Sequence, residues 1–150
     1  MIEKVNENTI ETLVDFAHKL WPDSCVEALR DDFLEVIADE DSGVFLYRAG
    51  ENGFAGFIQL SLRHDYVEGC DGSPVAYVEG IYVEEAFRRC KVAQALIAFA
   101  ETWGTQKGCT ELASDCELTN TLSIQFHSGS GFVETNRLVC FKKSLGGAAQ

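Results

Sequence analysis

Membrane, secreted and fibrous proteins carry recognisable sequence features, and this chain shows none of them. No apolar run approaches the roughly 20 residues that a membrane-spanning helix needs. The opening residues MIEKVNENTIETLVDF carry acids where a secretion signal carries bases, and they hold no uninterrupted apolar stretch. There are only 2 Pro and 13 Gly in 150 residues, too few for a collagen-like or low-complexity chain. These absences predict a cytoplasmic globular protein that does not bind membranes.

Closely spaced cysteine pairs are also missing. The six cysteines are scattered along the chain without a C-x-x-C motif: Cys25, Cys70, Cys90, Cys109, Cys116 and Cys140. Zinc sites and the disulfide frameworks of small secreted domains both have recognisable cysteine spacings. We therefore predict reduced thiols and no metal site.

Positive charge is scarce in this sequence. There are 12 Lys and Arg residues against 24 Asp and Glu residues, which gives a net charge of −12 at pH 7. A field of this sign repels phosphodiester backbones and anionic lipids, so we expect no nucleic acid among the partners. The same field attracts a polycationic ligand. The alternative is that the charge serves only to keep the protein soluble.

The chain does contain an apolar pattern that changes between helical and strand periods over the length of one domain. This pattern predicts helices over 9–21, 24–38, 92–106 and 120–128. It predicts strands over 44–47, 54–62, 75–83 and 112–114, a turn at Asn52-Gly53, and a closing hairpin of strands 132–135 and 138–141. The order of these elements predicts a mixed α/β (α+β) fold. We expect one domain over 1–145 and a frayed tail over 146–150.

Glu79 and Gly80 interrupt the strand VAYVEGIYV, which is otherwise apolar. An acid followed by glycine inside a buried strand is typical of a β-bulge. Either the bulge lies near a sheet edge without a further role, or it directs Glu79 into a functional site.

Basic residues collect where this strand leads into the helix of 92–106. Arg88, Arg89 and Lys91 lie in the connecting turn. A helix N-terminus presents free N–H groups and the positive end of the helix dipole, so it binds anions, and basic side chains add to that attraction. The turn therefore predicts a phosphate site. In the alternative interpretation, these bases only pair with nearby acids such as Glu84 and Glu85.

Several stretches of the chain resemble one enzyme family. They are LWPD, RHDYVEGCDGSPVAYVEGIYV, FRRCKVAQALI, WGTQKGCTELASD, NTLS and GFVETNRLVCF. From Leu20 to Phe141 the chain is similar to the aminoglycoside 6′-N-acetyltransferases of the GNAT N-acetyltransferase superfamily. The resemblance implies a GNAT fold, in which helices flank a mixed, mostly antiparallel central sheet and splayed strands form the acetyl-CoA cleft. It also implies a homodimer.

The resemblance implies a set of acetyl-CoA contacts. The strand end from Ile81 would pair with the pantetheine arm like an added strand, the basic turn would hold the pyrophosphate, and Asn120 would lie near the thiol. The full set is Ile81, Tyr82, Val83, Arg88, Arg89, Cys90, Lys91, Val92, Ala93, Gln94 and Asn120. Lys91 departs from the superfamily pattern, which has glycine there, and glycine permits a positive φ and a close backbone approach.

The resemblance also implies an acceptor site. Its members would be Trp21, Tyr66, Glu79, Asp115 and Asn136, with Glu79 and Asp115 as the catalytic carboxylates. An alkyl amine with a lysine-like pKa is neutral in only about one part in 10³ at pH 7, and a carboxylate can orient it and accept its proton through water. Asn136 stands where related enzymes carry an acid. Without the resemblance, Glu79 is interpreted as a bulge acid and Asp115 as a helix cap.

These features predict an enzyme that transfers acetyl directly from acetyl-CoA to the 6′-amine of an aminoglycoside in a ternary complex, and so confers antibiotic resistance. One alternative is a GNAT enzyme that acetylates another polyamine or a peptide amine. Another is a non-catalytic sensor that binds acyl-CoA, which the departures at Lys91 and Asn136 would fit. The residues do not indicate the drug spectrum or the general acid.

Overall fold

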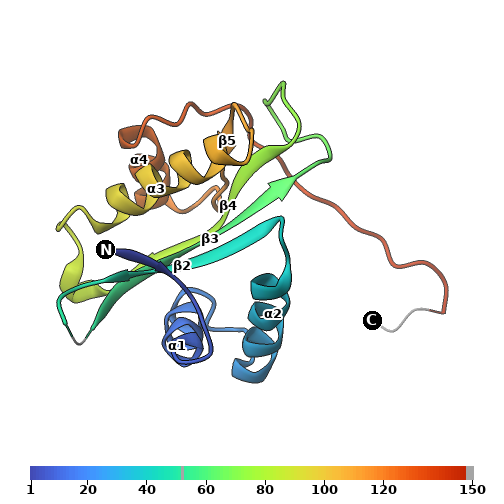
Figure 1. The fold of residues 1–150 in the computed structure, drawn as a ribbon. Coiled ribbons are helices and arrows are strands. Elements are labelled where there is room, and N and C mark those ends of the chain that lie inside the picture. Colours follow the sequence, from blue (N-terminus) through green and yellow to red (C-terminus); the bar gives the residue numbers. More distant parts are fainter. Residues whose placement is uncertain (52, 148–150) are drawn as a thin grey trace.

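A five-stranded sheet forms the centre of the protein (Figure 1). The computed structural model describes residues 1–51 and 53–147. The strands are neighbours in sequence order: β1 (Ile2–Lys4), β2 (Ser42–Arg48), β3 (Phe54–Arg63), β4 (Val75–Val83) and β5 (Leu112–Ala113). All pairs are antiparallel except β4 and β5, which confirms the mixed, mostly antiparallel sheet. Asn52 of the predicted turn and residues 148–150 of the predicted tail lie outside the described residues.

Helices cover both faces of this sheet. On one face lie α1 (Ile10–Leu20) and α2 (Val26–Ala38), and on the other lie α3 (Val92–Gln106) and α4 (Thr121–Gly129), as Figure 1 shows. A short 3₁₀ turn, η1 (Glu85–Phe87), follows β4. The predicted helices are confirmed, with ends within two residues of those observed. Within the described ranges, no helix has both the length and the apolar character that crossing a membrane requires.

Two apolar layers hold the sheet between the helices. In the middle of β3, Phe57 belongs to the layer under α1 and α2, while Ile58 belongs to the layer under α3. Both side chains are fully buried. Because β3 is covered on both faces, its apolar residues are not confined to alternate positions. Each fully buried Leu or Phe side chain stabilises the fold by about 1.5–3 kcal/mol, so these layers form a rigid support for the site.

The predicted bulge in β4 is confirmed. The pairing with β3 passes from Val78 directly to Gly80, so Glu79 is the extra residue. The bulge also changes the phase of the strand, because Val78 and Ile81 both pack in the layer under α3 although they are an odd number of positions apart.

β4 and β5 separate soon after they pair. Their pairing consists of Ala76 with Leu112 and Tyr77 with Ala113. In the part of the chain that the structure describes, no strand pairs with Val78–Val83 on that side. The strands splay as the resemblance implies, and the backbone polar groups along this edge of β4 are left to pair with something extended.

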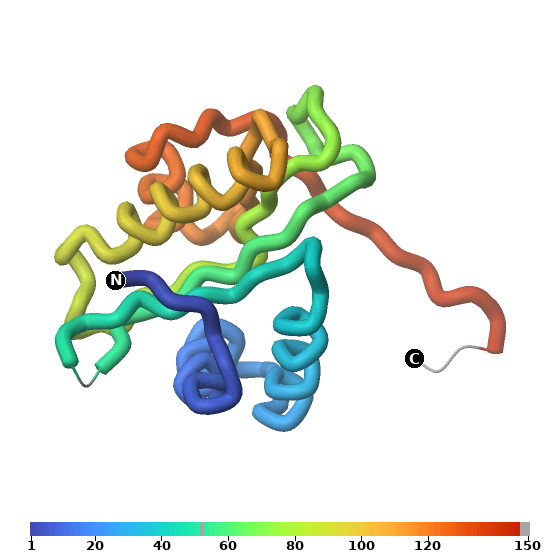
Figure 2. Tube along the Cα trace, viewed as in Figure 1, coloured from blue at the N-terminus to red at the C-terminus, as the bar shows by residue number. Residues whose placement is uncertain are grey.

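The predicted closing hairpin is wrong. Residues 132–145 contain no strand, and Figure 2 shows the later part of this segment leaving the body of the protein. Phe132 packs against the layer under α3, but the large apolar side chains beyond it are exposed, with Phe141 exposed to 91%. An apolar pattern indicates that side chains need cover, but it does not indicate which surface covers them. Here the two halves of the predicted hairpin do not cover each other.

Candidate active site

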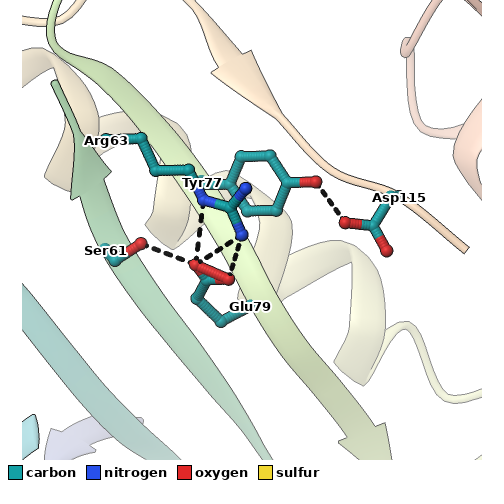
Figure 3. Close-up of polar contacts among 5 residues, drawn as sticks. All are labelled: Ser61, Arg63, Tyr77, Glu79 and Asp115. Atoms are coloured by element: carbon teal, nitrogen blue, oxygen red, sulfur yellow. Dashed lines mark hydrogen bonds and ion pairs between the residues drawn. The ribbon is translucent and has the colours of Figure 1, made fainter. Parts of the chain in front are cut away.

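Glu79, one of the two predicted catalytic carboxylates, is held by two side chains from β3 (Figure 3). Its Oε2 atom accepts a hydrogen bond from the Ser61 hydroxyl at 2.8 Å. Arg63 donates from Nη2 to Oε1 at 2.5 Å and to Oε2 at 3.0 Å, and from Nε to Oε2 at 3.2 Å. The hydrogen bonds to Glu79 raise the pKa of Arg63, so the guanidinium stays charged. Glu79 is therefore already paired with a cation.

Asp115, the other predicted catalytic carboxylate, lies just after β5 and close to Tyr77 of β4. The Tyr77 hydroxyl donates to Asp115 Oδ2. Burial and this hydrogen bond raise the pKa of Tyr77, so the phenol remains a donor at neutral pH. The Arg63 guanidinium lies over the Tyr77 ring, with Cζ 3.4 Å from the ring centroid. Ser61, Arg63, Tyr77, Glu79 and Asp115 thus form one connected set of contacts, which we call the carboxylate network.

The alternative interpretation of Asp115 as a helix cap is wrong. Asn120 caps α4, because its Oδ1 atom accepts from the Ser123 N–H at 3.1 Å. The residue before Asp115 is anchored by a histidine: the Ser114 hydroxyl lies 2.8 Å from His127 Nε2, and His127 Nδ1 lies 2.7 Å from the Ser123 carbonyl oxygen. His127 ties the end of β5 to α4 and thereby restricts the position of Asp115.

Trp21 lies directly over Gly80, next to Glu79. It is the C-cap residue of α1, and its ring packs edge-on against Phe57 with the centroids 6.3 Å apart. A Cβ atom added to Gly80 would lie 2.6 Å from the Trp21 ring, far inside normal contact distance. Only glycine lets the indole approach the backbone of β4 so closely. The structure therefore places the Trp21 ring beside Gly80, the residue that follows Glu79.

Tyr66 and Asn136 belong to a second part of the predicted acceptor site. Tyr66 is exposed in the loop between β3 and β4. Asn136 Nδ2 donates to Glu68 Oε1 of the same loop at 2.7 Å, a bond that an acid at position 136 could not make at neutral pH. Val67, between these loop residues, packs with Tyr77. The loop is thereby fixed beside the carboxylate network.

The basic turn before α3 has an unusual backbone. Arg89 has a φ of 65°, and Lys91, the N-cap residue of α3, has a φ of 62°. A residue with a Cβ atom is disfavoured in this left-handed region by roughly 1–2 kcal/mol. Arg88 Nε donates to the Val83 carbonyl at 3.1 Å, which folds the turn back onto the end of β4. Lys91 therefore adopts the positive φ for which glycine is suited, at an energetic cost.

The acids nearby do not neutralise the bases of this turn. Glu84 pairs with Lys19 of α1 at 2.6 Å. No ion pair among the residues described involves Arg88, Arg89 or Lys91. The alternative, in which these bases pair with the acids that precede them, is therefore wrong for this structure. Their charge is available to an anion at the start of α3.

The sequence reasoning did not identify Ser61, Arg63 or Tyr77 as site residues. A weak signal was present, since Ser61 and Arg63 are two positions apart, as are Tyr77 and Glu79 on the next strand. The predicted strand of 54–62 ended one residue before Arg63 and hid this spacing. The register that pairs Ser61 with Tyr77 brings the two sets together.

No hydrogen bond of the carboxylate network among the described residues involves a cysteine. All six are free. In the ranges that the structure covers, no group of three or more His, Cys, Asp and Glu side chains could hold a metal ion.

Sequence comparison relates this arrangement to known enzymes. A family model described as "Acetyltransferase (GNAT) family" matches residues 6–132. Two similar proteins are both named aminoglycoside N(6′)-acetyltransferase type 1. The one from Serratia marcescens is 38% identical over 146 residues, which cover 97% of this chain and 100% of that protein. The one from Salmonella enteritidis is 41% identical over 143 residues, which cover 95% and 97%.

Structural comparison agrees with the sequence. The structure of AAC(6′)-Iy in complex with the bisubstrate analog CoA-S-monomethyl-acetylneamine has a TM-score of 0.92, is 39% identical, and covers 97% of this chain and 98% of that chain. The apo structure of AAC(6′)-IG from Acinetobacter haemolyticus also has a TM-score of 0.92, with 33% identity over 97% and 99%. Family match, full-length relatives and shared fold all point the same way. The chain belongs to the acetyltransferase (GNAT) family, and within it to the group of aminoglycoside N(6′)-acetyltransferases of type 1.

Proposed function

We propose that this protein is an aminoglycoside 6′-N-acetyltransferase, which transfers acetyl from acetyl-CoA directly to the 6′-amine in a ternary complex and so confers resistance to the drug. The observation that carries the proposal is that the carboxylate network lies where β4 and β5 separate. The carboxylate network, which suits a cationic amine, is therefore adjacent to an unpaired strand edge, which suits an extended acyl carrier. The names of the relatives, and the CoA-based analog bound to one of them, support the same reaction.

The edge of β4 and the basic turn fit acetyl-CoA. Ile81 to Val83 have no strand partner on one side among the residues described, so their backbone groups suit an extended pantetheine arm. The start of the 15-residue helix α3, with Arg88, Arg89 and Lys91 beside it, suits the pyrophosphate. We assign Asn120, at the start of α4, to the thiol end. Acetyl-CoA, when bound, supplies an activated acetyl thioester.

Asp115 is suited to take the proton of the amine. The ammonium group must lose a proton before its nitrogen can attack a carbonyl carbon. Tyr77 engages Oδ2 of Asp115, which leaves Oδ1 to orient the ammonium group and accept its proton, directly or through water. We assign the remaining acceptor contacts to Trp21, Tyr66 and Asn136, with Glu79 holding Arg63 beside them.

A thiol-release assay tests the proposed function. The protein, mixed with acetyl-CoA and kanamycin or tobramycin, should release the CoA thiol with saturation kinetics, and mass spectrometry should locate the new acetyl group on the 6′-nitrogen. Turnover of spermine without turnover of an aminoglycoside would instead indicate a different polyamine acetyltransferase. Acetyl-CoA binding in calorimetry, without turnover of any amine, would indicate a sensor.

Replacing Lys91 with Gly should stabilise the free protein by up to about 1 kcal/mol, because glycine relieves the left-handed strain and only part of that gain is lost to the entropy of the unfolded chain. Acetyl-CoA affinity should change by less than about tenfold. Lys91→Glu should weaken acetyl-CoA binding more, because it brings a like charge to the phosphates. Thermal unfolding and calorimetry measure the two effects.

Lys107→Gly is the matched control for this substitution. Lys107 has a φ of −82°, so glycine relieves no strain there and should not stabilise the protein. Equal acetyl-CoA affinity of the wild type, Lys91→Gly and Lys91→Glu would mean that the Lys91 side chain does not face the phosphates. The phosphate site would then consist of the backbone and the two arginines.

We also propose that the protein is a homodimer in which residues 133–145 pack against a second copy. The segment has exposed large apolar side chains at Val133, Leu138, Val139, Phe141 and Leu145. Contiguous apolar surface on a soluble protein usually marks an interaction site. A second copy of the same chain is the simplest partner, because most soluble oligomers are symmetric homo-oligomers.

Phe141→Asp should dissociate this dimer. Phe141 is exposed in the single chain, so the substitution costs the monomer little but brings a charge into the interface. The dimer Kd from analytical ultracentrifugation should rise by at least about 100-fold. Leu34→Asp, at an exposed position of α2 outside the segment, is the control and should leave the Kd unchanged. A monomeric wild type, or equal Kd values for both variants, would contradict the proposal.

We propose that residues 1–145 act as one domain of a cytoplasmic enzyme, with 146–150 as a tail. The family match extends to residue 132, and the segment beyond it would find its packing partner in the second copy. The free cysteines suit a reducing compartment.

A further inference from the structure

Arg63 contacts Glu79 and lies over the ring of Tyr77, whose hydroxyl contacts Asp115 (Figure 3). We propose that Arg63 is a specificity-determining residue, which withholds Glu79 from the ammonium groups of the substrate and positions Asp115 as the one carboxylate that receives the reacting amine. The inference rests on the proposed function, because it concerns which carboxylate of the acceptor site binds the ammonium groups of the aminoglycoside.

Glu79 has little capacity left for a substrate. A carboxylate offers about four lone-pair positions. Glu79 accepts three N–H contacts from Arg63 and one O–H from Ser61. The contacts from Arg63 reach both oxygens, as in the strong fork-shaped pairs of guanidinium and carboxylate groups. An ammonium group must therefore displace Arg63 or Ser61 before it can bind Glu79.

Asp115 has the opposite surroundings. No ion pair in the part of the chain described neutralises it. Its one side-chain partner there is the Tyr77 hydroxyl, which engages Oδ2 and leaves Oδ1 unengaged. The negative charge of Asp115 is thus available to an amine, whereas that of Glu79 is already compensated.

Arg63 also acts on Asp115 through Tyr77. Two contacts hold the Tyr77 ring. It packs with Val67 and Val75, and Arg63 lies over it with Cζ 3.4 Å from the ring centroid. A cation over an aromatic face is an attractive contact that also excludes water. Loss of Arg63 should therefore loosen the ring and, with it, the hydroxyl that orients Asp115. In this respect Arg63 is a positioning residue.

The charge of the network follows from these contacts. Because Arg63 cancels one of the two carboxylates, the network carries a single net negative charge and balances one ammonium group. Without Arg63 it would carry two negative charges and attract a polycation more strongly. Stronger binding of the substrate in its ground state does not speed the reaction. Arg63 thus weakens binding of the drug in its ground state while it orients Asp115.

Arg63→Gln tests both effects, because glutamine is polar but uncharged. In calorimetry at low salt without acetyl-CoA, we expect the aminoglycoside Kd to fall by at least about fivefold, with a steeper dependence on ionic strength. In steady-state kinetics we expect kcat to fall by at least about tenfold. Arg63→Lys keeps the charge but loses the fork, so its Kd should stay near the wild-type value and its kcat should fall less.

Arg30→Gln is the matched control. Arg30 forms an ion pair with Glu11 at 2.7 Å between α1 and α2, outside the carboxylate network. Its replacement removes the same positive charge from the protein, so it reports the effect of net charge alone. Kd and kcat should both stay near their wild-type values.

Several results would overturn the proposal. A weaker aminoglycoside Kd for Arg63→Gln would mean that Arg63 itself binds the drug, and an equal change in Arg30→Gln would mean that only net charge matters. If the wild type acetylates aminoglycosides but Arg63→Gln changes neither Kd nor kcat, the inference fails and the proposed function stands. A wild type that neither binds nor acetylates them refutes both. If Arg63→Gln does not fold, a wild-type kcat for Arg63→Lys is the decisive negative result.

Discussion

Replacing Asp115 with Asn should lower kcat/KM for an aminoglycoside by about 10²-fold or more, the range typical of a lost general base. The amide is neutral and cannot take the proton that the amine must lose. It also removes the uncompensated negative charge of the carboxylate network. The amide oxygen can still accept from the Tyr77 hydroxyl, so the local structure should persist. Steady-state kinetics and calorimetry with acetyl-CoA measure the effect, and acetyl-CoA affinity should stay nearly constant.

Two further variants make this result interpretable. Asp32→Asn removes one negative charge from the exposed face of α2 and should leave kcat/KM almost unchanged. Glu79→Gln should lower kcat/KM less than Asp115→Asn, by about tenfold, because it acts by weakening the anchor of Arg63. An unchanged kcat/KM for Asp115→Asn would remove Asp115 from the catalytic site.

Gly80→Ala should raise the KM for an aminoglycoside by at least about fivefold and destabilise the protein by about 1–3 kcal/mol, as overpacking usually does. The added Cβ atom would lie 2.6 Å and 2.8 Å from two atoms of the Trp21 ring. The ring must move away from β4, and the acceptor site loses its aromatic wall next to Glu79. Thermal unfolding and steady-state kinetics give the two values.

A double-mutant cycle identifies the cause of this loss. In a Trp21→Ala background the ring is gone, so Gly80→Ala should cost much less stability than it does in the wild type. Gly129→Ala is the control, because nothing lies within 4 Å of the Cβ atom it would add. Equal losses for Gly80→Ala in both backgrounds would show that the strain lies in the β4 backbone and not in the contact with Trp21.

Elements that depend on their own neighbours could be predicted from residue patterns. The predicted helix of 92–106 has the same ends as α3, because its apolar residues recur at helical spacing and form one buried stripe. The predicted strand of 75–83 coincides with β4. The Glu79-Gly80 interruption indicated the bulge, because a charged residue and a glycine both disturb a regular buried strand.

The contacts of the site could not be predicted in the same way. Arg63 and Glu79 are 16 residues apart, and Tyr77 and Asp115 are 38 residues apart. Whether two such side chains meet depends on the register between strands, and a shift of one residue would turn each of them to the other face of the sheet. A sequence pattern shows that Arg63 is charged, but it does not show which carboxylate the guanidinium reaches.

The amino-acid pattern was sufficient for the family, the four helices and the strands β2 to β5, because motifs and periodicity over a few neighbouring residues carry both. Two features depend on atoms that lie far apart in sequence. These are the pairing of Glu79 but not Asp115 with a cation, and the lack of a hairpin over 132–145. Local periodicity reports whether a side chain tends to be buried and which backbone angles it prefers. It carries no information about the distance between two charges, or about the surface that an apolar segment meets, because packing and strand register set both.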